Sequence, residues 1–124
     1  MPCKVLAVDD SRTIRELLRV CLTTAGCEVE VAEDGIDGLE RLEGANPDVV
    51  ITDINMPRMD GFQFIEALRG GKLNSGVPIL VLTTESADDL KQRAREAGAA
   101  GWIVKPFDET KLISAIRRVT AYRG

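Results

Sequence analysis

Asp48-Val-Val-Ile-Thr-Asp53 is a short run of β-branched apolar residues that ends on a carboxylate. Such a run is typical of a strand buried on both faces of a parallel sheet. Four further runs with strand character occur along the 124-residue chain, at 4–9, 28–32, 78–82 and 101–104. Amphipathic stretches, with apolar residues three and four positions apart, separate these runs. Five alternations of strand and helix predict a parallel sheet with helices on both faces.

The run at 28–32 alternates polar and apolar residues, Glu28-Val-Glu-Val-Ala32, as an edge strand with one wet face does. Right-handed crossovers limit the remaining topologies. Together these features favour a doubly wound, five-stranded α/β fold of the flavodoxin-like type, with strand order 2-1-3-4-5 and five helices. We expect residues 1–124 to form a single domain.

Capping residues predict where the helices begin and end. Three single residues resemble N-caps, namely Ser11, Asp34 and Asp108. Two pairs resemble capping boxes, namely Asp60 with Gln63 and Ser86 with Asp89. We expect the glycines at 26, 44 and 70–71 to end the first three helices.

Composition excludes several classes of function. The net charge of -4 and the pI of about 4.9 argue against a nucleic-acid module, which needs clustered Lys and Arg. No apolar run approaches the ~20 residues that a membrane span requires, and no signal peptide is evident, so we expect a cytoplasmic protein.

The chain contains no histidine, which removes Ser-His-Asp and Cys-His chemistry and the zinc sites that use imidazole. Its three cysteines form no C-x-x-C pair and suit no disulfide framework. Any chemistry therefore rests on carboxylates, hydroxyls and lysine.

Polar side chains follow four of the five expected strands: Asp9 and Asp10, then Asp53, Thr83 and Lys105. In a 2-1-3-4-5 sheet these strand ends meet at one edge, and ligands bind where the winding reverses, between strands 1 and 3. Two carboxylates ~4 Å apart repel by roughly 4 kcal/mol at an effective dielectric constant of about 20. Three carboxylates need three positive charges, of which Lys105 supplies one and a divalent cation two. Hard oxygen donors without imidazole or thiolate favour Mg²⁺.

These groups are suited to phosphoryl transfer. A magnesium ion and Lys105 can draw charge from a transferring phosphoryl group, and Thr83 can hydrogen-bond one of its oxygens. Asp53 is then the predicted nucleophile, and its product is an acyl phosphate.

The combination of Asp9-Asp10, Asp53-x-x-Met56-Pro57-x-x-Asp60-Gly61, Thr83 and Lys105-Pro106-Phe107 resembles the receiver domain of bacterial two-component response regulators. The resemblance covers the whole chain, in order and with normal spacing. It implies a CheY-like fold and a signalling switch that takes phosphate from a histidine kinase, rather than a turnover enzyme.

The resemblance also implies roles for individual residues. Asp53 matches the phosphoacceptor, and Asp10 matches a direct Mg²⁺ ligand. Asp9 matches the acid that holds the metal through water, and the main-chain carbonyl of Asn55 matches a further ligand. Thr83 and Lys105 match the side chains that contact the phosphoryl group, and the bond between Lys105 and Pro106 matches one that is cis in the family.

Within this family the chain looks most like the stand-alone chemotaxis regulators of the CheY type, because of 101–107, Asn55 and Glu85. This likeness implies a CheA-like kinase, a protein target such as the flagellar motor switch, no nucleic-acid or membrane partner, and a monomer. The chain ends directly after the expected fifth helix, so we expect no output domain. A single-domain phosphorelay or developmental regulator is the alternative.

Three residues are singled out as modulators by the resemblance. Asn55 and Glu85 match positions that influence access of the hydrolytic water. Trp102 occupies a position where many receivers carry a Tyr or Phe that moves inward on activation. Trp102 could equally be an ordinary core aromatic of an edge strand.

Two other classes share parts of this pattern. A magnesium-dependent phosphatase of the haloacid-dehalogenase type carries a second aspartate two residues beyond its nucleophile, where this chain has Asn55. A flavodoxin-like FMN carrier needs a phosphate-binding loop after the first strand, where Asp9 and Asp10 would repel the phosphate.

Overall fold

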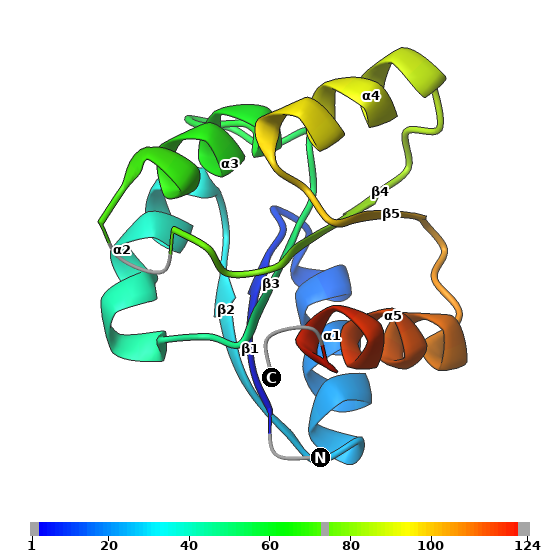
Figure 1. Cartoon of the computed structure of the whole chain (residues 1–124). Coiled ribbons are helices and arrows are strands. Elements are labelled where there is room, and N and C mark those ends of the chain that lie inside the picture. The colour runs from blue at the N-terminus through cyan, green and yellow to red at the C-terminus, as the bar shows by residue number, and fades with distance from the viewer. Residues whose placement is uncertain (1–2, 73–74, 122–124) are drawn as a thin grey trace.

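The computed structural model describes residues 3–72 and 75–121. Strands and helices alternate five times in this part of the chain (Figure 1). The strands are β1 (Cys3–Val8), β2 (Cys27–Ala32), β3 (Val49–Thr52), β4 (Ile79–Thr83) and β5 (Gly101–Val104). The helices are α1 (Arg12–Thr24), α2 (Gly35–Ala45), α3 (Gly61–Gly70), α4 (Asp88–Ala97) and α5 (Glu109–Ala121).

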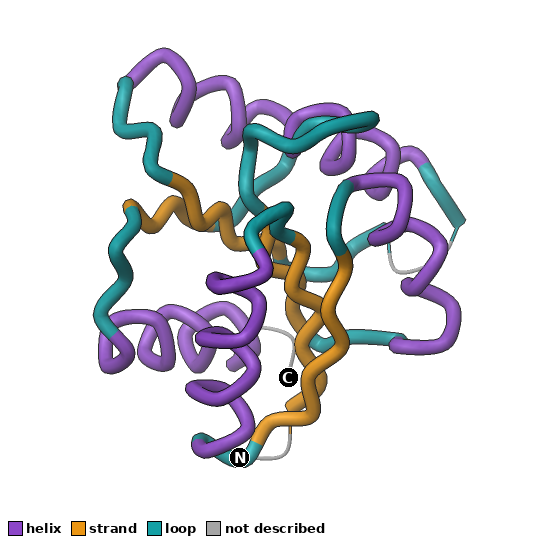
Figure 2. Tube along the Cα trace, turned by 180° about the vertical axis from the view of Figure 1, so that it is seen from behind, coloured by secondary structure: helices purple, strands orange, loops and turns teal. Residues whose placement is uncertain are grey.

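The five strands form one parallel sheet in the order β2-β1-β3-β4-β5, which confirms the predicted topology. The sheet lies between two layers of helices (Figures 1 and 2). Side chains alternate between the two faces along each strand. In β1, for example, Val5 and Ala7 pack in the core beneath α1 and α5, whereas Leu6 and Val8 pack beneath α2, α3 and α4.

The edge position of β2 is also confirmed. Glu28 and Glu30 are exposed, whereas Cys27 and Ala32 at the two ends of the strand are buried. In contrast, every residue of β3 is buried, as its continuous apolar sequence predicts.

Most of the predicted helix caps are present. The side chain of Ser11 accepts a hydrogen bond from the Ile14 amide, and that of Asp34 accepts one from the Asp37 amide. The Asp108 carboxylate accepts bonds from two amides of the first turn of α5. Asp60 and Gln63 form the reciprocal capping box at the start of α3.

Two boundary predictions are wrong. Helix α4 begins after Ala87, which makes no side-chain capping bond, so Ser86 and Asp89 do not form a capping box. Asp88 and Asp89 instead place two carboxylates in the first turn, where they face the positive end of the helix dipole. Helix α2 continues past Gly44, because Asn46 adopts the left-handed conformation (φ 41°) that ends it.

Candidate functional site

The site is built at the carboxyl ends of β1 and β3, which are neighbours in the sheet. Val8 and Thr52 are register partners, so Asp9 and Asp53 leave the sheet side by side. The amide of Asp53 donates to the carbonyl of Val8 at 2.9 Å, which continues the ladder to the acidic residue. Carboxylate oxygens of Asp9, Asp10 and Asp53 all lie within 4.8 Å of one another.

Lys105 brings a positive charge into this acidic cluster from the end of β5. Its ammonium Nζ donates to Oδ2 of Asp9 at 2.7 Å and to Oδ2 of Asp53 at 2.9 Å. The Lys105 side chain is only 10% exposed, and the Asp9 side chain only 2%. The peptide bond between Lys105 and Pro106 is cis, as expected.

Burial and hydrogen bonding set the pKa values of this pair. Burial raises the pKa of Asp9, although bonds from Lys105 and from the Ser11 amide act in the opposite direction. Burial lowers the pKa of Lys105, but its bonds to Asp9 and Asp53 outweigh this effect and leave the pKa raised. The lysine is therefore fully protonated near neutral pH, and it offsets part of the negative charge of the cluster.

The donor set fits a hard divalent cation. Asp10 is exposed, and within residues 3–72 and 75–121 no hydrogen bond or ion pair holds its carboxylate. Each oxygen of Asp53 accepts one bond, Oδ1 from the Ile54 amide at 2.6 Å and Oδ2 from Lys105, so lone pairs remain available. Three carboxylates beside one lysine leave a net negative charge, which Mg²⁺ can neutralise with the oxygen ligands that it prefers.

Thr83 ends β4 beside this cluster and is fully buried. Within the part of the chain that the structure describes, its hydroxyl oxygen accepts a single long hydrogen bond of 3.5 Å, from the Glu85 amide. Because a hydroxyl can rotate, the Thr83 hydroxyl can donate a hydrogen bond to a group bound at the strand ends. Asn55 follows Asp53 by two residues and is exposed.

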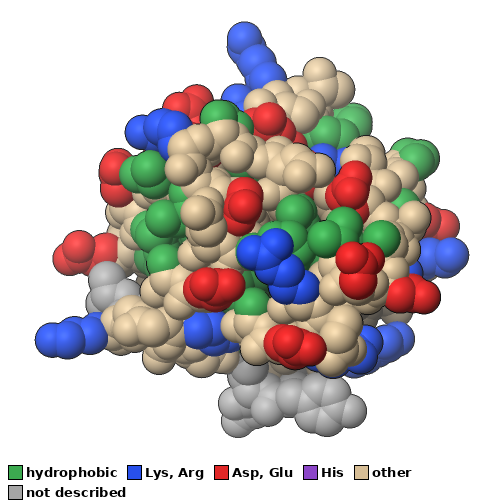
Figure 3. Space-filling model, turned by 90° about the horizontal axis from the view of Figure 1, so that it is seen from above, with side chains coloured by type: hydrophobic (Ala, Val, Ile, Leu, Met, Phe, Trp, Pro, Cys, Tyr) green, Lys and Arg blue, Asp and Glu red, His purple; other side chains and the backbone are tan. Residues whose placement is uncertain are grey.

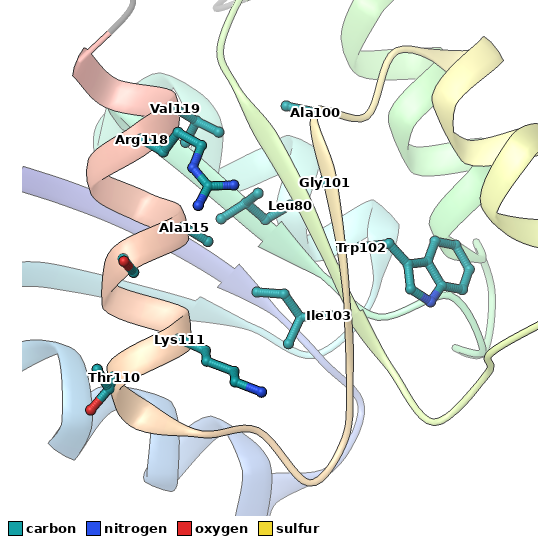
Figure 4. A pocket seen from close by; sticks show the side chains of 11 residues that line it. Leu80, Ala100, Gly101, Trp102, Ile103, Thr110, Lys111, Ala115, Arg118 and Val119 are labelled. Atoms are coloured by element: carbon teal, nitrogen blue, oxygen red, sulfur yellow. The ribbon is translucent and has the colours of Figure 1, made fainter.

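Trp102 and Glu85 contact each other. The indole Nε1 of Trp102 donates to the main-chain oxygen of Glu85 at 2.9 Å. The ring is partly buried against the core beneath α4. Figure 4 shows it on the opposite side of β5 from Ile103, which points toward α5. Trp102 is thus bonded to the loop that joins Thr83 to α4.

Sequence reasoning missed the contacts of two arginines near the site. Arg58 donates two bonds to the carboxylate of Asp34, at 2.7 and 3.0 Å, and so joins the loop after β3 to the start of α2. Arg15 donates to the main-chain oxygen of Asp9 at 2.7 Å. Neither contact has a sequence signal, since the partners in the first are 24 residues apart and the acceptor in the second is a main-chain oxygen, which any residue carries.

Positive and negative side chains are mixed on the face of the molecule that lies above the sheet in Figure 1. Figure 3 shows acidic and basic side chains interspersed over the face that is uppermost in Figure 1, with apolar side chains between them. Within the described residues, no helix is both long enough and apolar enough for a membrane crossing.

Comparison with known proteins gives consistent matches. The family model described as "Response regulator receiver domain" matches residues 5–117. Response regulator MprA of Mycobacterium sp. (strain KMS) is 38% identical over 117 residues, which cover 94% of this chain and 50% of that protein. Protein PilG of Pseudomonas aeruginosa is 32% identical over 114 residues, which cover 92% of this chain and 84% of that protein. This chain therefore spans about half the length of the MprA relatives that it matches.

A solved structure of chemotaxis protein CheY4 of Vibrio cholerae superposes with a TM-score of 0.90 and 45% sequence identity. The match covers 96% of this chain and 99% of that one. A response regulator structure from Chloroflexus aurantiacus superposes with a TM-score of 0.91 at 33% identity, over 98% of this chain and 99% of that chain.

Proposed function

Because this chain belongs to the response regulator receiver domain family, we propose that Asp53 accepts a phosphoryl group from a histidine kinase and that the change at this site controls a protein-binding face. Receiver domains are signalling switches of two-component systems, not turnover enzymes. The observation that carries the proposal is the ammonium of Lys105, bonded at once to Asp9 and Asp53 beside the open carboxylate of Asp10.

The chemistry proposed for Asp53 is a direct transfer. One carboxylate oxygen attacks the phosphorus of phosphohistidine, an O–P bond forms, the P–N bond breaks, and the imidazole leaves with the electron pair and takes up a proton. Mg²⁺, held by Asp10, Asp53 and the main-chain oxygen of Asn55, and by Asp9 through water, would supply positive charge beside the transferred oxygens. Lys105 and the hydroxyl of Thr83 would contact the added oxygens with charge-assisted hydrogen bonds.

The output face proposed for this switch consists of α4, β5 and α5. Thr83 leads through residues 84–87 into α4, and Lys105 follows β5 and precedes α5, so both phosphoryl-contacting residues are attached to this face. The bond from Trp102 to Glu85 ties β5 to the same loop. A new pull on Thr83 or Lys105 would therefore change the geometry of this face, with Trp102 as its reporter.

A groove on this face favours an acidic amphipathic segment as the target. It encloses about 380 Å³ between β5 and α5 (Figure 4). Leu80, Ile103 and Val119 supply apolar lining, and Lys111 and Arg118 supply positive charge. None of the described residues that line the groove is acidic.

We propose chemotaxis as the pathway, with a CheA-like kinase and a target such as the flagellar motor switch. The likeness to chemotaxis protein CheY4 along nearly its whole length supports this choice. A single-domain phosphorelay or developmental regulator is the second candidate, because the MprA relatives are described as response regulators without mention of chemotaxis. Asn55, two residues after the acceptor, and Glu85, two residues after Thr83, have small or moderate polar side chains, which would leave a path for hydrolytic water. A cytoplasmic monomer is part of the same proposal.

Mass spectrometry after incubation with acetyl phosphate and Mg²⁺ tests the acceptor. One phosphate should be added, and the Asp53→Asn variant should gain none that is sensitive to hydroxylamine. Phosphorylation of that variant at the wild-type rate would contradict the assignment. Incubation with a panel of phosphorylated kinase domains then identifies the donor, and phosphate loss over hours rather than minutes would favour the developmental alternative.

A further inference from the structure

An ion pair between a buried carboxylate and a half-exposed arginine lies beside the proposed acceptor site without taking part in its chemistry. The carboxylate of Asp34, 3% exposed, accepts Nε of Arg58 at 2.7 Å on one oxygen and Nη2 at 3.0 Å on the other. The pair lowers the pKa of Asp34, through the hydrogen bonds from Arg58. Asp34 belongs to the turn between β2 and α2, and Arg58 belongs to residues 54–60, which we call the acceptor loop.

The acceptor loop is fixed at the end that joins Asp53. The amide of Gly61 donates to the Ile54 carbonyl at 2.8 Å, so the ends of the loop are tied together. A Cβ atom at Gly61 would lie only 2.2 Å from the main-chain oxygen of Asp53. These contacts hold the two ends of the loop. They do not hold its middle, from Asn55 to Met59, which needs a separate anchor.

That anchor is the turn before α2. Arg58 has a left-handed backbone (φ 64°), and the Met59 amide donates to the Pro57 carbonyl across it at 2.7 Å. A non-glycine residue in this region costs free energy that surrounding contacts must offset. The two hydrogen bonds from Arg58 to Asp34 offset this cost. The Gly35 amide adds a hydrogen bond of 3.3 Å to the Met59 carbonyl.

The helix cap does not explain the ion pair. The Asp34 side chain accepts the Asp37 amide at 2.9 Å, and an uncharged asparagine caps a helix as well as aspartate does. The charge of Asp34 therefore binds Arg58, and through Arg58 it stabilises the conformation of the loop that carries Asn55.

We propose that Asp34 and Arg58 are positioning residues for the metal site: their ion pair holds the acceptor loop so that the main-chain oxygen of Asn55 faces the acidic cluster, and it thereby sets the affinity for Mg²⁺. This inference rests on the proposed function, in which that oxygen is a ligand. It assigns the pair an effect on metal affinity, and none on the chemical step once the metal is bound.

Two substitutions break the pair from opposite sides. Asp34→Asn removes the charge and keeps the cap, and Arg58→Ala removes the guanidinium while the backbone cost of a left-handed non-glycine residue stays similar. Arg41→Ala is the matched control, because Arg41 pairs with Asp37 and Glu30 on the same side of the molecule without contacting the acceptor loop.

Calorimetric titration with MgCl₂ measures the affinity directly, and circular dichroism checks that each variant is folded. Each single substitution should weaken Mg²⁺ binding by about tenfold, as loss of a group that orients a ligand does. The double variant should match the single ones within about twofold, since both remove one interaction. Phosphorylation by acetyl phosphate should need correspondingly more Mg²⁺ for half-saturation, with a maximal rate within about twofold of wild type.

Other results overturn the inference. Wild-type affinity in both folded single variants would do so, as would equal weakening by Arg41→Ala, or a reduced maximal rate at saturating Mg²⁺. If Arg58→Ala does not fold, Asp34→Asn alone decides. Wild-type protein that binds no Mg²⁺ or takes no phosphate would refute the proposed function itself, whereas normal wild-type behaviour with unaffected variants refutes only the role of the ion pair.

Discussion

Replacing Lys105 with methionine should destabilise the protein more than any other change of a single charge at the site. The substitution keeps most of the side-chain length and removes the ammonium that contacts both Asp9 and Asp53. These two carboxylates would then face each other and Asp10 without a cation, since the three groups lie within 4.8 Å.

The structure gives the magnitude of this loss. At 2.7 and 2.9 Å, each ammonium–carboxylate contact carries about 6 kcal/mol of gross attraction at an effective dielectric constant of about 20. Desolvation of the buried charges cancels much of this, and removing one partner of a buried pair costs about 3–5 kcal/mol. We expect a loss of that size in the free energy of unfolding without metal. Magnesium should recover more stability in the variant than in wild type, because the carboxylates have lost their competing cation.

The pH dependence has a definite sign. Burial already raises the pKa of Asp9, and the bond from Lys105 opposes that rise, so the pKa should rise further in the variant. The folded state then keeps a proton that the unfolded chain releases above about pH 4. A raised carboxyl pKa contributes stability at low pH that is lost as the pH rises toward the folded value, so the variant should lose stability with rising pH more steeply than wild type.

Urea unfolding followed by circular dichroism, in EDTA and in MgCl₂ at several pH values, measures these effects. Lys4→Met is the control, because Lys4 and Glu28 form an ion pair of 4.0 Å with side chains 54% and 78% exposed, which is worth about 0–1 kcal/mol. The reasoning would be refuted if Lys105→Met lowered the free energy of unfolding no more than the control does. It would also be refuted if the free energy of unfolding changed with pH as it does in wild type.

Three further predictions concern single contacts. Gly61→Ala should cost about 3 kcal/mol in urea unfolding, because its Cβ would lie 2.2 Å from the Asp53 main-chain oxygen, whereas Gly70→Ala, with open space around it, should change stability by less than about 1 kcal/mol. At a Mg²⁺ concentration 100 times the dissociation constant, the metal should stabilise the wild-type protein by about 2.7 kcal/mol, and Asp10→Asn should abolish most of this gain. In EDTA the Asp10→Asn variant should be more stable than wild type. A Mg²⁺-dependent shift in the calorimetric melting temperature that is the same in variant and wild type would contradict this. Trp102→Phe should cost about 1 kcal/mol by removing the 2.9 Å bond to a carbonyl of the β4–α4 loop, and no loss in urea unfolding would show that water replaces that bond fully.

The sheet could be predicted from the sequence because each strand is a short, distinct apolar run. The polar alternation of Glu28 and Glu30 indicated an edge strand, and together with right-handed crossovers this favoured the strand order that the structure has. Helix boundaries were less certain where several polar residues compete for the cap. Residues 84–89 are all short or polar, and pattern alone favoured Ser86 over the actual start after Ala87.

The acidic cluster and its lysine could be predicted because strand ends are determined by topology. Once β1 and β3 are neighbours, Asp9 and Asp53 must meet. The ion pair between Asp34 and Arg58 could not be predicted, since it joins two loops. It also depends on the left-handed backbone of Arg58, which periodicity does not reveal. The same holds for the bond from the Trp102 indole to a loop carbonyl.

The position of Lys105 directly after the last strand has a consequence for synthesis on the ribosome. The acidic groups of the site are complete once Asp53 has been translated, but their cation follows 52 residues later. At about 5–20 residues per second, the nascent chain carries these carboxylates for roughly 3–10 s before the lysine is made. Chains that stall before Lys105 would hold three uncompensated carboxylates at the carboxyl ends of the central strands, so a residue near the end of the chain supplies the charge that stabilises a site formed by its first half.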